Sequence, residues 1–369
     1  MPIDRQVQKV LEEFERFGAP PITSLSPQEA RLAPTISDAV SALRQKRRVR
    51  PASEPISAID NQLIEGLEGE IPLRIYRPGG DGPFPVVIYF HSGGWVLGDL
   101  NSGDTLCRTL ANLAQCLVVS VDYHLAPEYP FPTAAQDAYA AMQWVMAAAT
   151  LNSDPARVAV MGEDAGANLA AVAALMARDS GTPLPIYQVL VYPITNYTFD
   201  TPSYTQHANA RPLSSEMMRW FWKHYLPEEA AGSTPYASPL QAADLHNLPR
   251  ALILTAEYDP LRDEGEAYAR RLQEAGVPVV LTRYKGLTHG FLDMAPVVEK
   301  ARGAMLAIAS ALRSIFSRDQ QMARQPQPAR SIPPTIPIQA GLQMILTGEL
   351  LPQAPAASIF LSAESPAPG

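Results

Sequence analysis

The 369-residue sequence contains no apolar run that approaches the ~18 residues of a membrane-spanning helix. Its N-terminus begins with charged residues, among them Asp4, Arg5 and Lys9, and lacks the apolar segment of a secretion signal. These two absences predict a soluble, cytoplasmic protein with no membrane span.

Positive charge is also scarce in this chain. There are 29 lysines and arginines against 37 aspartates and glutamates, which gives a formal net charge of -8. Because a chain with this excess of acid has little to neutralise phosphates, we expect no nucleic-acid partner. The one basic run, residues 44–50, is interpreted as the solvated end of a helix.

Cysteine is nearly absent, with only Cys107 and Cys116 in the chain. Neither has a metal-binding residue type beside it at a metal-site spacing. The sequence therefore predicts two buried thiols, with no disulfide and no metal site.

Apolar runs alternate with helical patterns from residue 71 to residue 316. The predicted strands are 71–76, 85–90, 116–121, 158–161, 188–192, 251–255 and 279–284, and the predicted helices are 105–113, 133–146, 166–178, 262–275 and 297–316. Several strands are continuous apolar runs, which suit parallel strands buried on both faces. This alternation predicts an α/β fold with a mostly parallel, doubly wound central sheet flanked by helices.

The rest of the chain divides around this core. Residues 1–50 are predicted to form a helical cap segment, whose second helix has Ser37 as its cap. Residues 51–318 form the α/β domain, with an aromatic-rich cap insertion at about 196–235. Nine prolines fall between residues 325 and 369, so residues 319–369 are predicted to be a disordered tail. Its apolar stretch 340–346 is either a docking segment or a turn without function.

One five-residue segment, Gly162-Glu163-Asp164-Ala165-Gly166, decides the functional question. It follows an apolar strand and precedes a helix of small residues. That is the setting of a nucleophile elbow, G-x-S-x-G, in which a serine attacks the substrate. The serine is missing, and Asp164 stands in its place.

Three further segments surround this motif with catalytic residue types. Gly93 and Gly94 follow a strand, and adjacent glycines let backbone amides face a developing oxyanion. Asp259 lies at the end of a strand and before a helix. Capping that helix is the simpler role, and a catalytic role is the alternative. His289 follows the last strand between flexible turns, as suits a general base. The order elbow, Asp, His is that of α/β-hydrolase triads.

With these motifs the chain resembles the hormone-sensitive-lipase-like (bacterial family IV) carboxylesterases over residues 50–315. The matching segments are His91-Ser92-Gly93-Gly94-Trp95, residues 122–128, the elbow, residues 259–263 and His289-Gly290-Phe291. The resemblance implies the α/β-hydrolase fold with a helical cap, hydrolysis of short- to medium-chain acyl esters, and no metal or cofactor. A small ester-like molecule would be the substrate, and a homodimer is compatible with the family.

The resemblance also implies roles for individual residues. The amides of Gly93, Gly94 and Ala165 would form the oxyanion hole, and Asp259 would orient His289. Glu128 would be a buried structural carboxylate near the site. The predicted substrate-binding residues are Trp95, Glu163 and Tyr197.

Asp164 leaves several functions open. A carboxylate that attacks an ester carbonyl would form a mixed anhydride, so ordinary serine-type hydrolysis would be lost or very slow. Asp164 would suit attack on sp³ carbon, as in the haloalkane dehalogenases and epoxide hydrolases, although no halide-binding Trp pair or epoxide-activating Tyr pair is evident. It could also act as a base on water. The remaining interpretations are a ligand-binding pseudoenzyme, as in the gibberellin receptors of similar fold, and a substitution that disables an esterase.

Overall fold

The computed structural model describes residues 2–46, 54–148 and 151–323, with side chains described up to residue 317. One compact unit contains these residues. The apolar stretch 340–346 and the proline-rich segment predicted as a tail lie outside the described residues.

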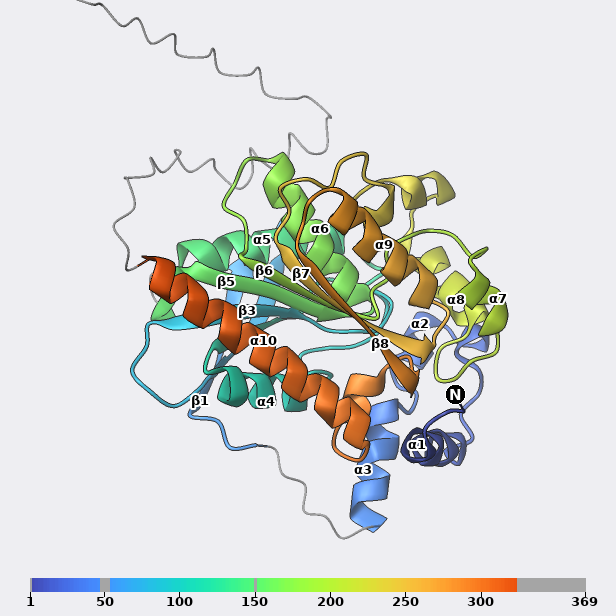
Figure 1. Ribbon diagram of the computed structural model, residues 1–369. Coiled ribbons are helices and arrows are strands. Elements are labelled where there is room, and N and C mark those ends of the chain that lie inside the picture. The colour runs from blue at the N-terminus through green and yellow to red at the C-terminus, as the bar shows by residue number, and fades with distance from the viewer. Residues whose placement is uncertain (1, 47–53, 149–150, 324–369) are drawn as a thin grey trace, which may run out of the picture. The chain divides into compact units, whose positions relative to one another are not determined.

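An eight-stranded sheet forms the centre of this unit (Figure 1). Its strand order is β1-β2-β4-β3-β5-β6-β7-β8, with β1–β2 and β2–β4 antiparallel and every other pair parallel. The strands are β1 (Ala58–Glu65), β2 (Glu70–Arg77), β3 (Phe84–Phe90), β4 (Leu117–Val121), β5 (Ser153–Glu163), β6 (Tyr187–Val191), β7 (Arg250–Tyr258) and β8 (Val279–Thr288). The predicted mostly parallel sheet is confirmed.

The strand β1 was not predicted from the sequence. It carries the polar run Asp60-Asn61-Gln62 and lies mostly exposed at the antiparallel end of the sheet, so it has no apolar pattern to detect. The central strand β3, by contrast, is buried along its whole length. Both cysteines are buried and free, as predicted.

Helices cover both faces of the sheet. They are α1 (Arg5–Glu15), α2 (Pro27–Ala30), α3 (Ile36–Lys46), α4 (Asp104–Ala114), α5 (Thr133–Ala147), α6 (Ala165–Asp179), α7 (Pro202–Gln206), α8 (Ser215–Tyr225), α9 (Arg262–Glu274) and α10 (Glu299–Ala323). Short 3₁₀ turns lie at η1 (Ile22–Ser24), η3 (Glu229–Ser233), η4 (Pro239–Gln241) and η5 (Phe291–Met294). Figure 1 shows α4 and α10 on one face and α5, α6 and α9 on the other.

The two predicted cap segments lie at the end of the sheet to which the parallel strands point. Figure 1 shows α1 and α2 of the N-terminal segment and α7 and α8 of the insertion on this side. This is the edge where ligands bind in open α/β folds.

Two predicted helix boundaries are corrected. The helix α3 begins at Ile36, and Thr35 forms a reciprocal cap with Asp38, whereas Ser37 lies inside the helix. The helix α10 continues to Ala323, beyond the predicted domain end at residue 318. Residues 319–323 contain Gln, Met and Ala, which favour helix, so the proline-rich composition begins later than the predicted boundary.

No helix in the described ranges has the length and apolar character needed to cross a membrane.

Candidate active site

The elbow is a sharp turn between β5 and α6. Asp164 is the residue before the helix and has φ 56° and ψ -119°, a conformation that few non-glycine residues adopt. A Cβ on Gly166 would lie 2.0 Å from the Phe90 carbonyl oxygen, so only glycine fits where the helix starts against β3. The turn thus places the Asp164 side chain at the carboxyl end of the central strands.

The Asp164 carboxylate is held by two backbone amides. Its Oδ2 accepts hydrogen bonds from the Gly93 amide at 3.1 Å and the Gly94 amide at 2.9 Å. The turn that presents these amides is tight: Gly93 has φ 124°, and a Cβ there would lie 2.2 Å from the Leu97 carbonyl oxygen. The amides predicted to bind an oxyanion therefore bind an oxygen of the chain itself. Ala165 is the first residue of α6, and its contribution stays a prediction.

His289 lies between two carboxylates. Its Nδ1 is 2.9 Å from Asp259 Oδ2, and its Nε2 is 3.5 Å from Asp164 Oδ1. All three side chains are buried, with 5% of Asp164, none of Asp259 and 8% of His289 exposed. The structure therefore brings together the three residues that the sequence predicts as catalytic.

The two carboxylates change the acidity of His289. Burial lowers its pKa, but the charge of Asp259, the hydrogen bond that His289 donates to Asp259 and the charge of Asp164 outweigh burial and raise the pKa to about 9. The imidazole is therefore protonated at neutral pH and cannot accept a proton there. Removing one flanking carboxylate would lower this pKa.

Asp259 is fixed by its own loop. Its Oδ1 accepts the Leu261 amide at 2.9 Å, while Oδ2 faces His289. The carboxylate thus uses one oxygen for the start of α9 and the other for the imidazole. Asp259 therefore stabilises the turn before α9 and contacts His289 with one side chain, whereas the N-cap of α9 is Leu261, which has no side-chain capping bond.

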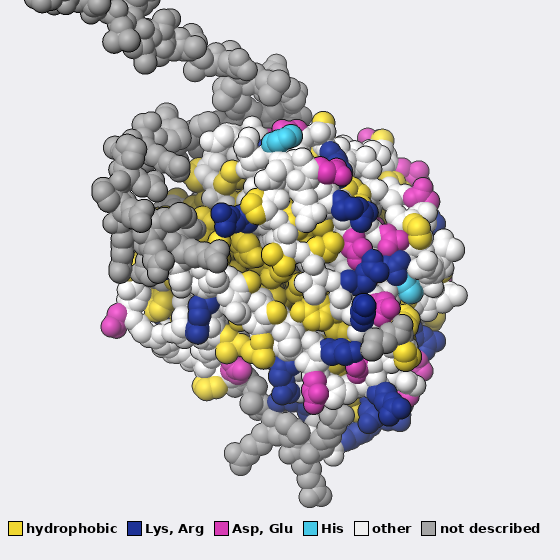
Figure 2. All heavy atoms as spheres, in the orientation of Figure 1, with side chains coloured by type: hydrophobic (Ala, Val, Ile, Leu, Met, Phe, Trp, Pro, Cys, Tyr) yellow, Lys and Arg dark blue, Asp and Glu magenta, His cyan; other side chains and the backbone are white. Residues whose placement is uncertain are grey.

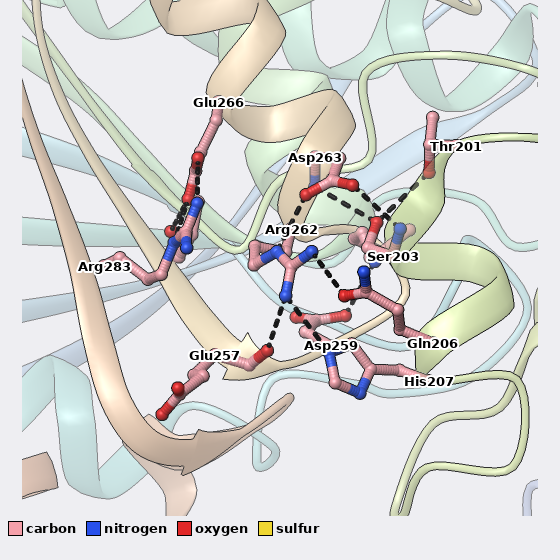
Figure 3. A network of polar contacts seen from close by, with 12 residues as sticks. Thr201, Ser203, Gln206, His207, Glu257, Asp259, Arg262, Asp263, Glu266 and Arg283 are labelled. Carbon is pink, nitrogen blue, oxygen red and sulfur yellow. Dashed lines mark hydrogen bonds and ion pairs between the residues drawn. The ribbon is translucent and has the colours of Figure 1, made fainter. Parts of the chain in front are cut away.

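A polar network ties the cap helix α7 to the loop that carries Asp259 (Figure 3). The Ser203 hydroxyl donates to the Pro260 carbonyl at 2.6 Å, and its amide donates to Asp263 at 2.8 Å. The Arg262 guanidinium pairs with Asp263 and donates to the Glu257 carbonyl. This network holds the cap insertion against the loop that carries Asp259.

Two of the predicted substrate-binding residues, Trp95 and Glu163, have buried side chains. Trp95 is fully buried, with its ring stacked on Tyr225 at 4.0 Å and tilted against Trp222 at 4.7 Å. Glu163 is only 2% exposed and accepts hydrogen bonds from the hydroxyls of Tyr89 and Tyr192. Both side chains are enclosed by neighbouring residues and offer no surface to a ligand. Tyr197 is half-buried, so its substrate contact stays a prediction.

The prediction that Glu128 is a buried carboxylate is wrong, because its side chain is 40% exposed and pairs with Arg31. Arg31 donates to both Glu128 oxygens and to the carbonyls of Val96 and Ala126. The hydrogen bond from Arg31 lowers the pKa of Glu128 to about 2. Sequence reasoning missed Arg31, because about 100 residues separate it from Glu128 and no local motif marks the pair.

The arrangement can hold an anion but cannot start serine chemistry. Two amides and an imidazolium surround the Asp164 carboxylate, which is the environment that an acyl-transfer site builds for an oxyanion. No hydroxyl nucleophile occupies position 164. Across the described ranges there is no group of three His, Cys, Asp or Glu side chains that could hold a metal ion.

Comparisons with known proteins identify the family of the chain. The profile of the alpha/beta hydrolase fold family matches residues 87–293. The chain is 44% identical over 262 residues to carboxylic ester hydrolase LipN of Mycobacterium tuberculosis, covering 69% of this chain and 70% of that one. It is 36% identical over 318 residues to an arylesterase of Saccharolobus solfataricus, covering 86% and 100%.

A solved esterase structure shows the same fold. The hyperthermophilic esterase of Pyrobaculum calidifontis has a TM-score of 0.79 and 40% identity, covering 85% of this chain and 99% of that one. The fold, the order of the motifs and these relatives agree with one another. The chain belongs to the α/β-hydrolase fold family, among its hormone-sensitive-lipase-like carboxylesterases.

Proposed function

We propose that the chain binds small carboxylic esters in a carboxylesterase site whose acyl-enzyme step Asp164 prevents. The observation that carries the proposal is the position of Asp164 Oδ2 on the amides of Gly93 and Gly94. Those amides would otherwise stabilise the oxyanion of a tetrahedral intermediate. The side chain at 164 thus both lacks a nucleophilic hydroxyl and fills the place of the oxyanion.

The protonated histidine supports the same conclusion. A serine esterase needs a neutral imidazole to take the proton of the hydroxyl. Here His289 is kept protonated by carboxylates on both of its nitrogens. Serine at position 164 would remove one of these carboxylates, vacate the two amides and supply the nucleophile in a single change.

The test is Asp164→Ser assayed with p-nitrophenyl butyrate. We expect the variant to hydrolyse the ester at least about 10³-fold faster than the native chain, since loss of the nucleophile costs about 10⁶-fold in such triads. Its rate should rise with pH around a midpoint below 9, because Asp164 no longer raises the pKa of His289.

Two matched variants make this test specific. Asp164→Ala vacates the amides without adding a nucleophile and should stay as slow as the native chain. Asp164→Ser combined with His289→Ala should lose the gain. A native chain that turns over the ester as fast as Asp164→Ser would refute the proposal.

A second candidate function is attack by Asp164 on sp³ carbon, and one observation favours it. Oδ2 of Asp164 accepts both amides, whereas Oδ1 has only the longer, 3.5 Å contact with Nε2 of His289. Oδ1 would bond to the carbon while a halide departs with its electron pair, or while an epoxide C–O bond breaks and the resulting alkoxide takes the proton of His289. The alkyl ester is neutral, so the pKa of His289 falls, and after a halide departs the imidazolium loses its proton to solvent. Neutral His289 then takes a proton from water as the water oxygen attacks Cγ, and it returns this proton to the departing alkoxide, which leaves as the alcohol and restores the Asp164 carboxylate.

The test of this candidate is a trapped alkyl ester. His289→Gln cannot activate the water, so the ester on the enzyme should persist. Incubation with bromobutane should add the mass of one butyl group in place of a proton, and incubation with styrene oxide should add the mass of the whole epoxide. Peptide mapping should locate it on Asp164, and Asp164→Ala should show none. Unchanged intact mass with both reagents would exclude attack on these substrate classes.

A further inference from the structure

Glu163 joins two tyrosines beneath the elbow. It directly precedes Asp164, and its Oε1 accepts the Tyr89 hydroxyl at 2.7 Å while its Oε2 accepts the Tyr192 hydroxyl. Neither tyrosine is more than 2% exposed. A buried carboxylate with both oxygens bonded is held in one orientation, and it holds its donors in turn.

One of the two tyrosines also touches the catalytic histidine. The Tyr192 ring centroid lies 4.6 Å from the His289 ring and 5.1 Å from Phe291. Tyr192 therefore contacts Glu163 through its hydroxyl and His289 through its ring.

The backbone around Tyr192 binds the elbow as well. The Asp164 amide donates to the Val191 carbonyl at 3.0 Å, and the Ile194 amide donates to the Asp164 carbonyl at 3.3 Å. Tyr192 lies between these two contacts with φ 37°, an unusual value for an aromatic residue. The surrounding structure thus keeps Tyr192 in a conformation that costs free energy, as is typical of residues at functional sites.

We propose that Tyr192 and Glu163 are positioning residues for His289: the bond to Glu163 fixes the tyrosine ring, and the ring fixes the imidazole plane between Asp164 and Asp259. Nδ1 of His289 forms a 2.9 Å hydrogen bond to Asp259, whereas its Nε2 lies 3.5 Å from Asp164. Because the χ2 torsion of histidine has a broad energy well and the second contact is long, the ring can still rock about the bond to Asp259. Contact with the Tyr192 ring supplies a further restraint.

The same residues shape the charge around the imidazole. Asp259, Asp164, Glu163 and Asp293 of η5 all act on His289. Burial raises the pKa of both Glu163 and Asp293. The two tyrosine hydroxyls lower the pKa of Glu163 and so favour its charged form. Loss of the Tyr192 hydroxyl would therefore reduce the negative charge beneath His289 as well as release the ring.

The first test uses the native chain and needs no enzymatic activity. The ring nitrogens of His289 are followed by ¹⁵N NMR as a function of pH in Tyr192→Phe and Glu163→Gln. We expect the titration midpoint of His289 to fall in both variants and its ring signals to broaden. Tyr139→Phe is the matched control, since it removes another buried hydroxyl, bonded to Thr182 away from the site. An unchanged His289 in Tyr192→Phe would overturn the proposal.

The second test combines Tyr192→Phe with Asp164→Ser. It measures ester hydrolysis and therefore rests on the proposed function. We expect Tyr192→Phe to lower kcat about tenfold with little change in KM, because displacement of a catalytic group affects the transition state most. Tyr89→Phe keeps the bond between Tyr192 and Glu163 and should cost less. Equal kcat in Asp164→Ser and its Tyr192→Phe variant would contradict positioning. If Asp164→Ser were inactive, the proposed function would fail while the NMR test would still decide this inference.

Discussion

Three non-glycine residues at the site have positive φ angles: Trp95 at 62°, Asp164 at 56° and Tyr192 at 37°. Each such residue costs about 1–3 kcal/mol and persists only where the surrounding structure requires it. Trp95 follows the two glycines that bind Asp164, and Tyr192 contacts His289. The strained residues therefore lie beside the groups that surround the Asp164 carboxylate.

The raised pKa of His289 predicts how stability changes with pH. An unfolded histidine has a pKa of about 6.5, and the folded value of about 9 is higher. This group therefore contributes its full stabilisation below about pH 6.5 and loses it as the pH rises through 9. The corresponding loss in free energy of unfolding is about 3–4 kcal/mol.

Urea unfolding of the native chain at intervals from pH 7 to pH 10 checks this prediction. His289→Gln should flatten the slope over that range. His246→Gln removes an exposed histidine and should leave the slope as it is. A native chain whose unfolding free energy stays constant over this range would show that His289 is not held protonated.

At the residue level the sequence predicted that three side chains would lie together, but not all their contacts, and their catalytic role stays a prediction. Asp164, Asp259 and His289 were predictable because each follows a strand, and parallel strands bring such residues to one edge. The hydrogen bonds from the Gly93 and Gly94 amides to Asp164 could not be predicted, because they depend on a side-chain torsion. Tyr192 looked like the last residue of a strand, and only tertiary structure reveals its contact with His289.

At the level of elements, the N-terminal segment is linked to the loop after the two glycines. Arg31, at the end of α2, donates to the carbonyl of Val96 at 2.9 Å and to that of Ala126 at 2.9 Å. The Val96 carbonyl lies two residues beyond Gly94, which binds Asp164. One arginine of the cap segment thus supports the turn that presents the amides.

The elements themselves were predictable to different degrees. The buried parallel strands and the helices between them follow from apolar runs and helical spacing, because burial on both faces leaves a clear pattern. The strand β1 has no such pattern and forms by antiparallel pairing with β2. The attachment of α2 through Arg31 depends on residues about 100 positions apart, for which a single sequence carries no signal.

At the scale of the whole molecule, one face carries a cluster of apolar side chains. Figure 2 shows them near the middle of the face on which Figure 1 draws α10 and β8. The strand β8 is the last in the sheet order, and Val280 and Leu281 on it are 57% and 36% exposed. An edge strand with exposed apolar residues favours association with another strand. A homodimer stays a prediction, and the β8 edge is the surface that would form its interface.

Truncation can test how much α10 contributes to the fold. Four large apolar side chains of α10 are at most 8% exposed, namely Ile308, Leu312, Ile315 and Phe316. At about 1.5–3 kcal/mol each, their burial contributes about 6–12 kcal/mol, comparable with the 5–15 kcal/mol that stabilises a typical protein. A chain of residues 1–298 should therefore fail to fold.

A chain of residues 1–323 retains all four and should melt within about 2 °C of the full-length protein, because these buried contacts set its stability. Thermal unfolding followed by circular dichroism measures both. A markedly lower Tm for residues 1–323 would show that the proline-rich segment contributes to the fold, and a folded chain of residues 1–298 would show that α10 does not belong to the core.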